Sequence, residues 1–161
     1  MAKYLLLANV GNRDLMLAGE RIEPARMRGK EIADNFEKHR QDLTIPILQP
    51  VIDFVQAEVP KAQLDLQLFC TDQEDENHRK NDTLYFGECI KKLLSGRQPV
   101  GKVNLREIKA NPNLVDSMFR YFADQLSSLR SRADEYEKVF IALEAVDKFL
   151  MPIDSAVSES C

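Results

Sequence analysis

Short apolar runs alternate with amphipathic stretches along this chain. Residues 3–10 form a nearly continuous apolar run that ends at Gly11, a pattern typical of a strand buried on both faces of a parallel sheet. In residues 63–70, leucines alternate with polar residues, which predicts a strand exposed on one side. Two more strands are predicted over residues 100–108 and 138–143.

Between these strands, apolar residues recur at the spacing of amphipathic helices. The predicted helices cover residues 25–40, 44–58, 83–94 and 111–132. Thr44 is the expected cap of the second helix, although Pro50 implies a kink or a later start, and Gly96 is the expected stop of the third. Strands that alternate with helices predict an α/β, Rossmann-like domain, with a mainly parallel sheet and helices on both faces.

The length of 161 residues suits a single domain. We expect this domain to cover residues 1–143, because the periodic pattern decays after Leu143. Residues 144–161 contain one weak apolar cluster and a serine-rich end, so we expect an irregular or frayed tail.

Composition excludes several classes of protein. No apolar run approaches the roughly 20 residues of a membrane helix, and the N-terminal apolar stretch ends in Gly-Asn-Arg-Asp rather than a cleavage site, so we expect a cytoplasmic protein that does not bind membranes. The net charge of −4 gives no general attraction for duplex nucleic acid. Any anionic ligand must therefore be held by a local site.

The sequence lacks the usual motifs of metal-binding, redox and nucleoside-triphosphate-binding proteins. The three cysteines (Cys70, Cys89 and Cys161) are far apart, which argues against disulfides and zinc. Neither GxGxxG nor GxxxxGK[ST] occurs, and His39 has no Asp or Cys neighbour that would complete a triad or a metal site. We expect no cofactor and no metal.

A polar segment follows the first predicted strand, at the edge of the sheet where ligands bind in open α/β folds. It consists of Asn9, Val10, Gly11, Asn12, Arg13 and Asp14. Gly11 lets the backbone pass close to a ligand, Asn12 offers a donor and an acceptor, and Arg13 suits a phosphate. A tight turn in which Arg13 pairs with Asp14 would give the same sequence, and both interpretations stay open.

A second polar segment follows the strand at residues 63–70. It contains Thr71, Asp72 and Gln73, then His78, Arg79 and Lys80, and finally Asp82 and Thr83 before the next helix. The cations suit a phosphodiester and Gln73 suits a base or ribose edge. For Asp82 and Thr83 we favour a helix-capping role, whereas for Thr71 and Gln73 we favour a ligand site.

Together these segments resemble the CRISPR-associated Rossmann-fold (CARF) domain of type III CRISPR ancillary proteins, the sensor half of CARF-HEPN ribonucleases. The resemblance lies in LLANVGNRDL (6–15), FCTDQ (69–73), HRKNDTL (78–84) and ANPNLVDSMFRYFADQL (110–126). It implies a homodimer that binds a cyclic oligoadenylate, foremost cyclic tetra-adenylate, across its two-fold axis in antiviral signalling. The implied pocket is lined by residues 9–14 and 71–73, joined by His78 and Arg79.

The sequence departs from the family after residue 143. Longer relatives have a Gly-Thr-Pro-type segment there, whereas this chain has EAVDKFLMP, and no HEPN Arg-x4-6-His motif follows because His78 is the last histidine. The leading hypothesis is therefore a binding module without its nuclease. The alternatives are a metal-independent ring nuclease that cleaves the same ligand, and a structural domain that binds only a protein partner.

Overall fold

The computed structural model describes residues 2–109, 120–121, 123–125, 127–128, 135–143 and 149–152. Its centre is a five-stranded sheet in the order β6-β5-β1-β7-β8. The strands are β1 (Lys3–Asn9), β5 (Gln63–Thr71), β6 (Val100–Ile108), β7 (Lys138–Leu143) and β8 (Phe149–Pro152). The first four are mutually parallel and β8 is antiparallel to β7.

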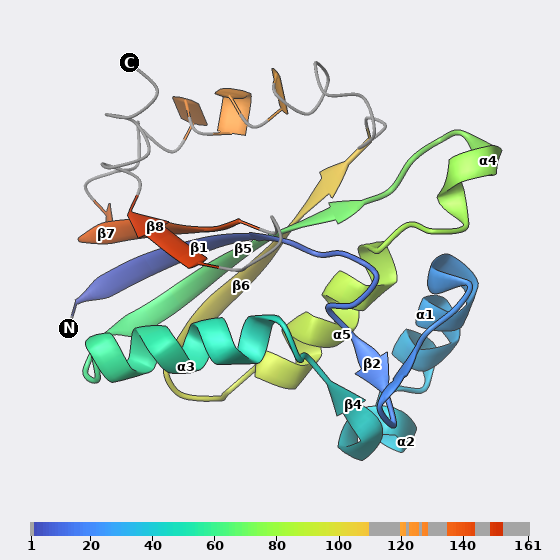
Figure 1. The fold of residues 1–161 in the computed structure, drawn as a ribbon, viewed down its shortest axis with the longest axis horizontal. Helices are drawn as coiled ribbons and strands as arrows, with labels where there is room; N and C mark the ends of the chain where they lie inside the picture. Colours follow the sequence, from blue (N-terminus) through green and yellow to red (C-terminus); the bar gives the residue numbers. More distant parts are fainter. Residues whose placement is uncertain are drawn as a thin grey trace.

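The order of the parallel strands reverses at β1. The chain builds the sheet outward from β1 to β5 and β6, and then crosses back to place β7 on the other side of β1. The carboxyl ends of the four parallel strands point to the right in Figure 1. This topology confirms the predicted Rossmann-like fold and the four strand positions.

Three helices lie on one side of the sheet and form the larger core with it. They are α1 (Ala25–Asp34), α3 (Leu48–Glu58) and α5 (Leu84–Leu94). Figure 1 shows α3 and α5 below the sheet and α1 further out, beside α5. At Gly29 of α1 an added Cβ would lie 3.1 Å from the ring of Phe86, so glycine allows this close helix contact. The apolar face of the sheet here includes Leu6, Leu66 and Leu68.

The opposite face of the sheet has a smaller core that contains buried polar groups. Leu5, Leu7, Phe69, Ile108 and Val139 form its apolar part, and Tyr121 and Tyr136 pack on it. Asp65 and Gln67 lie on this face only 3% and 5% exposed. The expectation that residues 63–70 are exposed on one side is therefore wrong. Alternation arises here because the polar residues are buried with partners rather than solvated.

Asp65 illustrates how this burial is compensated. Its carboxylate accepts hydrogen bonds from Gln63 Nε2 (3.0 Å), from the backbone N–H of Lys102 (2.9 Å) and from the Tyr136 hydroxyl (2.9 Å). Burial raises the pKa of Asp65, but these donors outweigh it, so the pKa lies below its usual value.

A small second sheet and two short helices occupy the connection between β1 and α3. The strands of this second sheet are β2 (Met16–Leu17), β3 (Glu20–Arg21) and β4 (Leu43–Thr44), in the order β3-β2-β4. Thr44 is thus a strand residue and not a helix cap, and α3 starts later, at Leu48. The single helix expected over residues 25–40 is interrupted at Asn35, which has non-helical dihedral angles, and continues as α2 (Phe36–His39) and the 3-10 turn η1 (Arg40–Asp42).

Two other segments differ from the expectation. Residues 74–82, where no helix is predicted, contain the single helical turn α4 (Glu76–Arg79), whose start is capped by the Asp75 carboxylate accepting from the N–H of Asn77 (2.9 Å). In the expected irregular tail, Phe149–Pro152 form β8. Most of the helix predicted over residues 111–132 lies outside the described residues, and those described between 120 and 128 are helical.

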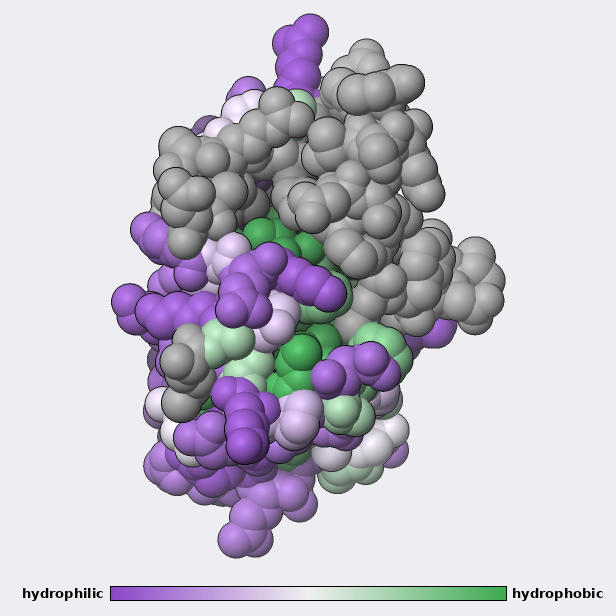
Figure 2. All heavy atoms as spheres, turned by 90° about the vertical axis from the view of Figure 1, so that its left-hand side faces the viewer, coloured by the Kyte–Doolittle hydropathy of each residue, from purple (hydrophilic) through white to green (hydrophobic). Residues whose placement is uncertain are grey.

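Figure 2 shows the molecule from the side where the strands begin. In the coloured part of this face, an apolar area near the centre has hydrophilic side chains on its left and below it. In the described part of the chain, no helix has the length and apolar character needed to cross a bilayer.

Candidate functional site

The carboxyl edge of the sheet is built around the end of β1. The N–H of Val10 donates to the carbonyl of Phe69 (2.9 Å), and the carbonyl of Val10 accepts from the hydroxyl of Thr83 (2.8 Å). The segment after β1 is thereby fixed to both β5 and the start of α5. Because the strand order reverses between β1 and β7, this segment lies beside the crevice where open α/β sheets bind ligands.

The loop after β1, residues Asn9 to Asp14, forms a tight turn that leaves its middle exposed. The carboxylate of Asp14 accepts from the N–H of Gly11 (2.6 Å), and the N–H of Asp14 donates to the carbonyl of Gly11 (3.1 Å). Asn12 and Arg13 are exposed between them. Arg13 makes no ion pair with Asp14 or with any other residue that the structure describes. The turn interpretation is thus correct for Asp14, but the guanidinium of Arg13 is not part of it.

The other two predicted residues of this loop lie closer to the sheet. Asn9 ends β1 and is half-buried, whereas Val10 belongs to the larger core at 5% exposed. Val10 therefore contributes its backbone to the edge, and its side chain contributes to packing.

The loop after β5, defined as the last strand residue Thr71 together with Asp72 and Gln73, differs from the loop after β1 because each of its side chains has a partner within the protein. Thr71 and Thr83 exchange two hydrogen bonds: the N–H of Thr71 donates to the Thr83 hydroxyl (3.1 Å), and the N–H of Thr83 donates to the Thr71 hydroxyl (3.0 Å). Thr83 precedes α5 at the capping position, but its hydroxyl serves Val10 rather than the helix backbone.

Gln73 is held by Asp82. The Asp82 carboxylate accepts from the backbone N–H of Gln73 (2.6 Å) and from its side-chain Nε2 (2.8 Å). Asp82 is fully buried and Gln73 is 7% exposed. The sequence favours a helix cap for Asp82 and a ligand contact for Gln73, whereas in the structure the two residues bind each other and close the loop.

Asp72 joins two cations that the sequence interpretation did not include. Its Oδ1 accepts from Arg26 Nη1 (2.8 Å), and its Oδ2 from Lys109 Nζ (2.5 Å). These bonds, first that of Lys109 and then that of Arg26, hold the pKa of Asp72 below its usual value. Lys109 directly follows β6, so the rule that sites gather after strands could have found it. Arg26 lies in the first turn of α1, and only the fold brings it here.

His78 and Arg79 lie on α4, between β5 and α5. His78 is exposed, with Nε2 3.8 Å from Oδ2 of Asp75, and Arg79 is half-buried. Lys80 follows them and is exposed. Three potential cations therefore flank the loop after β5 on its outer side.

Comparisons with known proteins find no matching family model, no matching curated protein and no matching solved structure. The resemblance to CARF domains therefore stays a prediction. The edge of the sheet must be interpreted from its own geometry.

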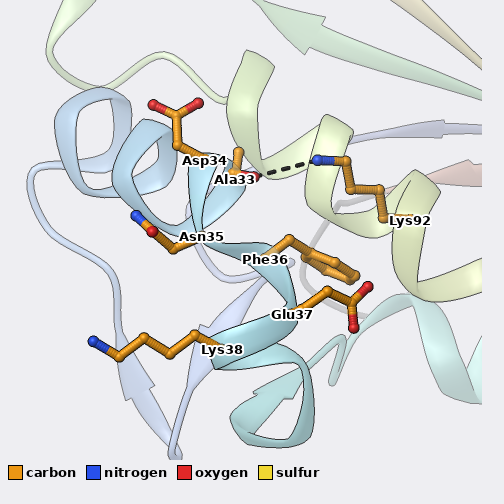
Figure 3. Close-up of a pocket in the computed structure, with 7 residues that line it drawn as sticks. All are labelled: Ala33, Asp34, Asn35, Phe36, Glu37, Lys38 and Lys92. Carbon is orange, nitrogen blue, oxygen red and sulfur yellow. Dashed lines mark hydrogen bonds between the residues drawn. The ribbon is translucent and has the colours of Figure 1, made fainter.

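Two surface pockets lie away from this edge and include none of the predicted residues. One, of about 420 Å³, lies where α1 meets α2 and is lined by the seven residues drawn in Figure 3. There Lys92 of α5 donates to the carbonyl of Ala33 (3.2 Å). The other, of about 390 Å³, lies between β4, the start of α3 and the end of α5.

The described cysteines and acidic residues form no metal centre. No group of three or more His, Cys, Asp or Glu within the described ranges is arranged to hold an ion. Cys70 and Cys89 are buried, and burial raises their thiol pKa values to about 12 and about 11. Both thiols stay protonated at neutral pH and are poor nucleophiles.

Proposed function

We propose that this chain binds a cyclic oligoadenylate at the carboxyl edge of its sheet, with the loop after β1 as the main contact. The observation that carries the proposal is the position of Arg13, which lies next to the point where the strand order reverses. Its side chain is exposed and has no ion-pair partner among the described residues. The resemblance of this loop to that of CARF domains supports the same ligand class.

The physical argument starts from the cost of binding a phosphate. A guanidinium that already pairs with a carboxylate must break that pair before it binds an anion, whereas Arg13 has no such pair with any residue in the described ranges. Its planar donor pair fits two phosphate oxygens. Gly11 and Asp14 fix the ends of the turn, which limits the conformational entropy lost on binding.

The loop after β5 supports this site rather than forming its main contact. Thr71 and Gln73 hold the edge together through Thr83 and Asp82. Arg79 and Lys80, at the end of α4 and directly after it, supply two positive charges that suit further phosphates of a ring, and the exposed imidazole of His78 lies on the same short helix. In a homodimer, as the resemblance implies, both loops would act twice on a two-fold ligand.

Calorimetry with cyclic tetra-adenylate tests the proposal. Arg13→Ala should weaken binding by about tenfold to hundredfold, because it removes a charged hydrogen bond of about 1.5–3 kcal/mol. Arg97→Ala is the matched control, because Arg97 is also exposed but lies before β6, at the opposite edge. Equal affinities for the wild type and Arg13→Ala would exclude the loop after β1, and no binding by the wild type would exclude the function.

The same samples distinguish a sensor from a ring nuclease. Chromatography of the ligand after incubation in EDTA should return the intact ring. Linear adenylates that accumulate with the wild type would instead support metal-independent cleavage.

A further inference from the structure

One carboxylate at the carboxyl edge bridges two cations from different elements. Asp72 places Oδ1 at 2.8 Å from Arg26 Nη1, in α1, and Oδ2 at 2.5 Å from Lys109 Nζ, after β6. The side chains of Asp72 and Arg26 are 14% and 21% exposed, and that of Lys109 is 55% exposed. Solvent therefore reaches the cluster from the side of Lys109.

The arrangement matches what two oxygens of a phosphate require. Each oxygen of Asp72 contacts a different cation, and two non-bridging oxygens of a phosphate can make the same pair of contacts. Both side-chain bonds of Arg26, to Asp72 and to Asp82 (3.2 Å), use Nη1. Its Nη2 and Nε therefore donate to no residue that the structure describes.

Arg26 does not depend on Asp72 alone for its position. The fully buried carboxylate of Asp82 also holds Nη1, and the guanidinium lies 5.6 Å from the centre of the Tyr85 ring. The backbone of Asp72 is fixed as well, since its N–H donates to the carbonyl of Ile108 (2.9 Å). Rotation of one side chain is enough to exchange the carboxylate for another anion.

We propose that Arg26 and Lys109 form a binding site for a phosphate oxyanion, which Asp72 occupies as an internal counter-ion. With Asp72 in place, three carboxylates (Asp72, Asp82 and Glu107) face these two cations, so the cluster disfavours a further anion. The site admits a phosphate when Asp72 turns away or loses its charge. This inference does not rest on the cyclic ligand of the proposed function.

Asp72→Asn tests the inference with inorganic pyrophosphate as the probe. The variant keeps the size of the side chain and removes its charge, and we expect it to bind pyrophosphate at low ionic strength about tenfold more tightly than the wild type does. Adding Arg26→Ala to this variant should abolish the gain. Glu107→Gln is the matched control, because Glu107 also pairs with Lys109 (3.1 Å) but has no ion pair with Arg26.

Three results would overturn the inference: no gain in a folded Asp72→Asn chain, an equal gain in Glu107→Gln, or a gain that survives Arg26→Ala. If Asp72→Asn does not fold, side-chain NMR of the wild type tests the site, because pyrophosphate in excess competes with the Asp72 carboxylate even at weaker affinity. Millimolar pyrophosphate should then shift the Arg26 Nε–H signal and leave that of Arg97 unchanged, and an unmoved Arg26 signal contradicts the site. Binding of cyclic tetra-adenylate by the wild type, measured separately, tests the proposed function independently.

Discussion

The loops after β1 and after β5 lie side by side at one edge of the sheet, yet they use their polar residues differently. After β1, Asn12 and Arg13 are exposed, and only Asp14 is bound within its turn. After β5, the side chains of Thr71, Asp72 and Gln73 all bind other side chains of the protein. Polar residues that follow a strand therefore reach the edge of the sheet in both loops. Whether such a loop can bind a ligand or holds the edge together depends on whether its side chains are buried and already have partners within the protein.

The largest expected effect is a loss of stability when Asp82, the buried partner of the loop after β5, is replaced. Asp82→Ala removes a buried acceptor of three donors: the backbone N–H and the side-chain Nε2 of Gln73, and Nη1 of Arg26. The free energy of unfolding should fall by about 3 kcal/mol, measured by urea denaturation. Asp34→Ala, which removes an exposed partner of Lys30, should change it by less than about 0.5 kcal/mol. Equal losses in the two variants would contradict the structural role of Asp82.

A smaller effect should separate Gln73 from Arg13. Gln73→Ala removes a buried hydrogen bond and should lower the free energy of unfolding by about 1–2 kcal/mol. Arg13→Ala should leave it within about 0.5 kcal/mol of the wild type, because the exposed guanidinium has no partner among the described residues to lose. Thermal and urea denaturation of both variants check this contrast. An Arg13→Ala chain that is the less stable of the two would reverse the assignment of the loops.

The pH dependence of stability should show that the charge of Asp72, in the loop after β5, stabilises the fold. The pKa of Asp72 is lowered in the folded protein, so its stabilising contribution is present above the unfolded pKa of about 4 and is lost as the pH falls through the folded pKa. The difference in unfolding free energy between the wild type and Asp72→Asn, about 1 kcal/mol at pH 6, should shrink below about pH 4. A difference that stays constant down to pH 2.5 would show that the charge of Asp72 does not stabilise the fold.

The smallest effect concerns Cys70, which lies in β5 directly before Thr71. Burial and its raised pKa of about 12 should keep this thiol unreactive toward a maleimide at pH 8 until the edge opens. Arg13→Ala should leave the labelling rate unchanged, whereas Asp82→Ala should increase it. Mass spectrometry of labelled peptides measures the rate at Cys70 itself. Rapid labelling of the folded wild type would contradict a closed loop after β5.

The sequence predicted the sheet well because strand burial leaves a strong periodic pattern. The four parallel strands and α5 were predicted close to their observed bounds. The short strands of the second sheet were not predicted, because two-residue strands have no period. The partners of the loop after β5 were also missed: Arg26 and Lys109 reach Asp72 across intervals of 46 and 37 residues, which no local pattern reveals.

Chemical-shift mapping with cyclic tetra-adenylate tests the central claim most directly. In ¹⁵N-labelled protein, the ligand should shift the amide signals of Gly11, Asn12 and Arg13 most strongly. The amide of Gln73, which is held by Asp82, should shift less, and that of Phe36 in the distant pocket should not move. Unchanged signals from Gly11 to Arg13 at saturating ligand, or shifts confined to the pocket around Phe36, would contradict a ligand site at the loop after β1.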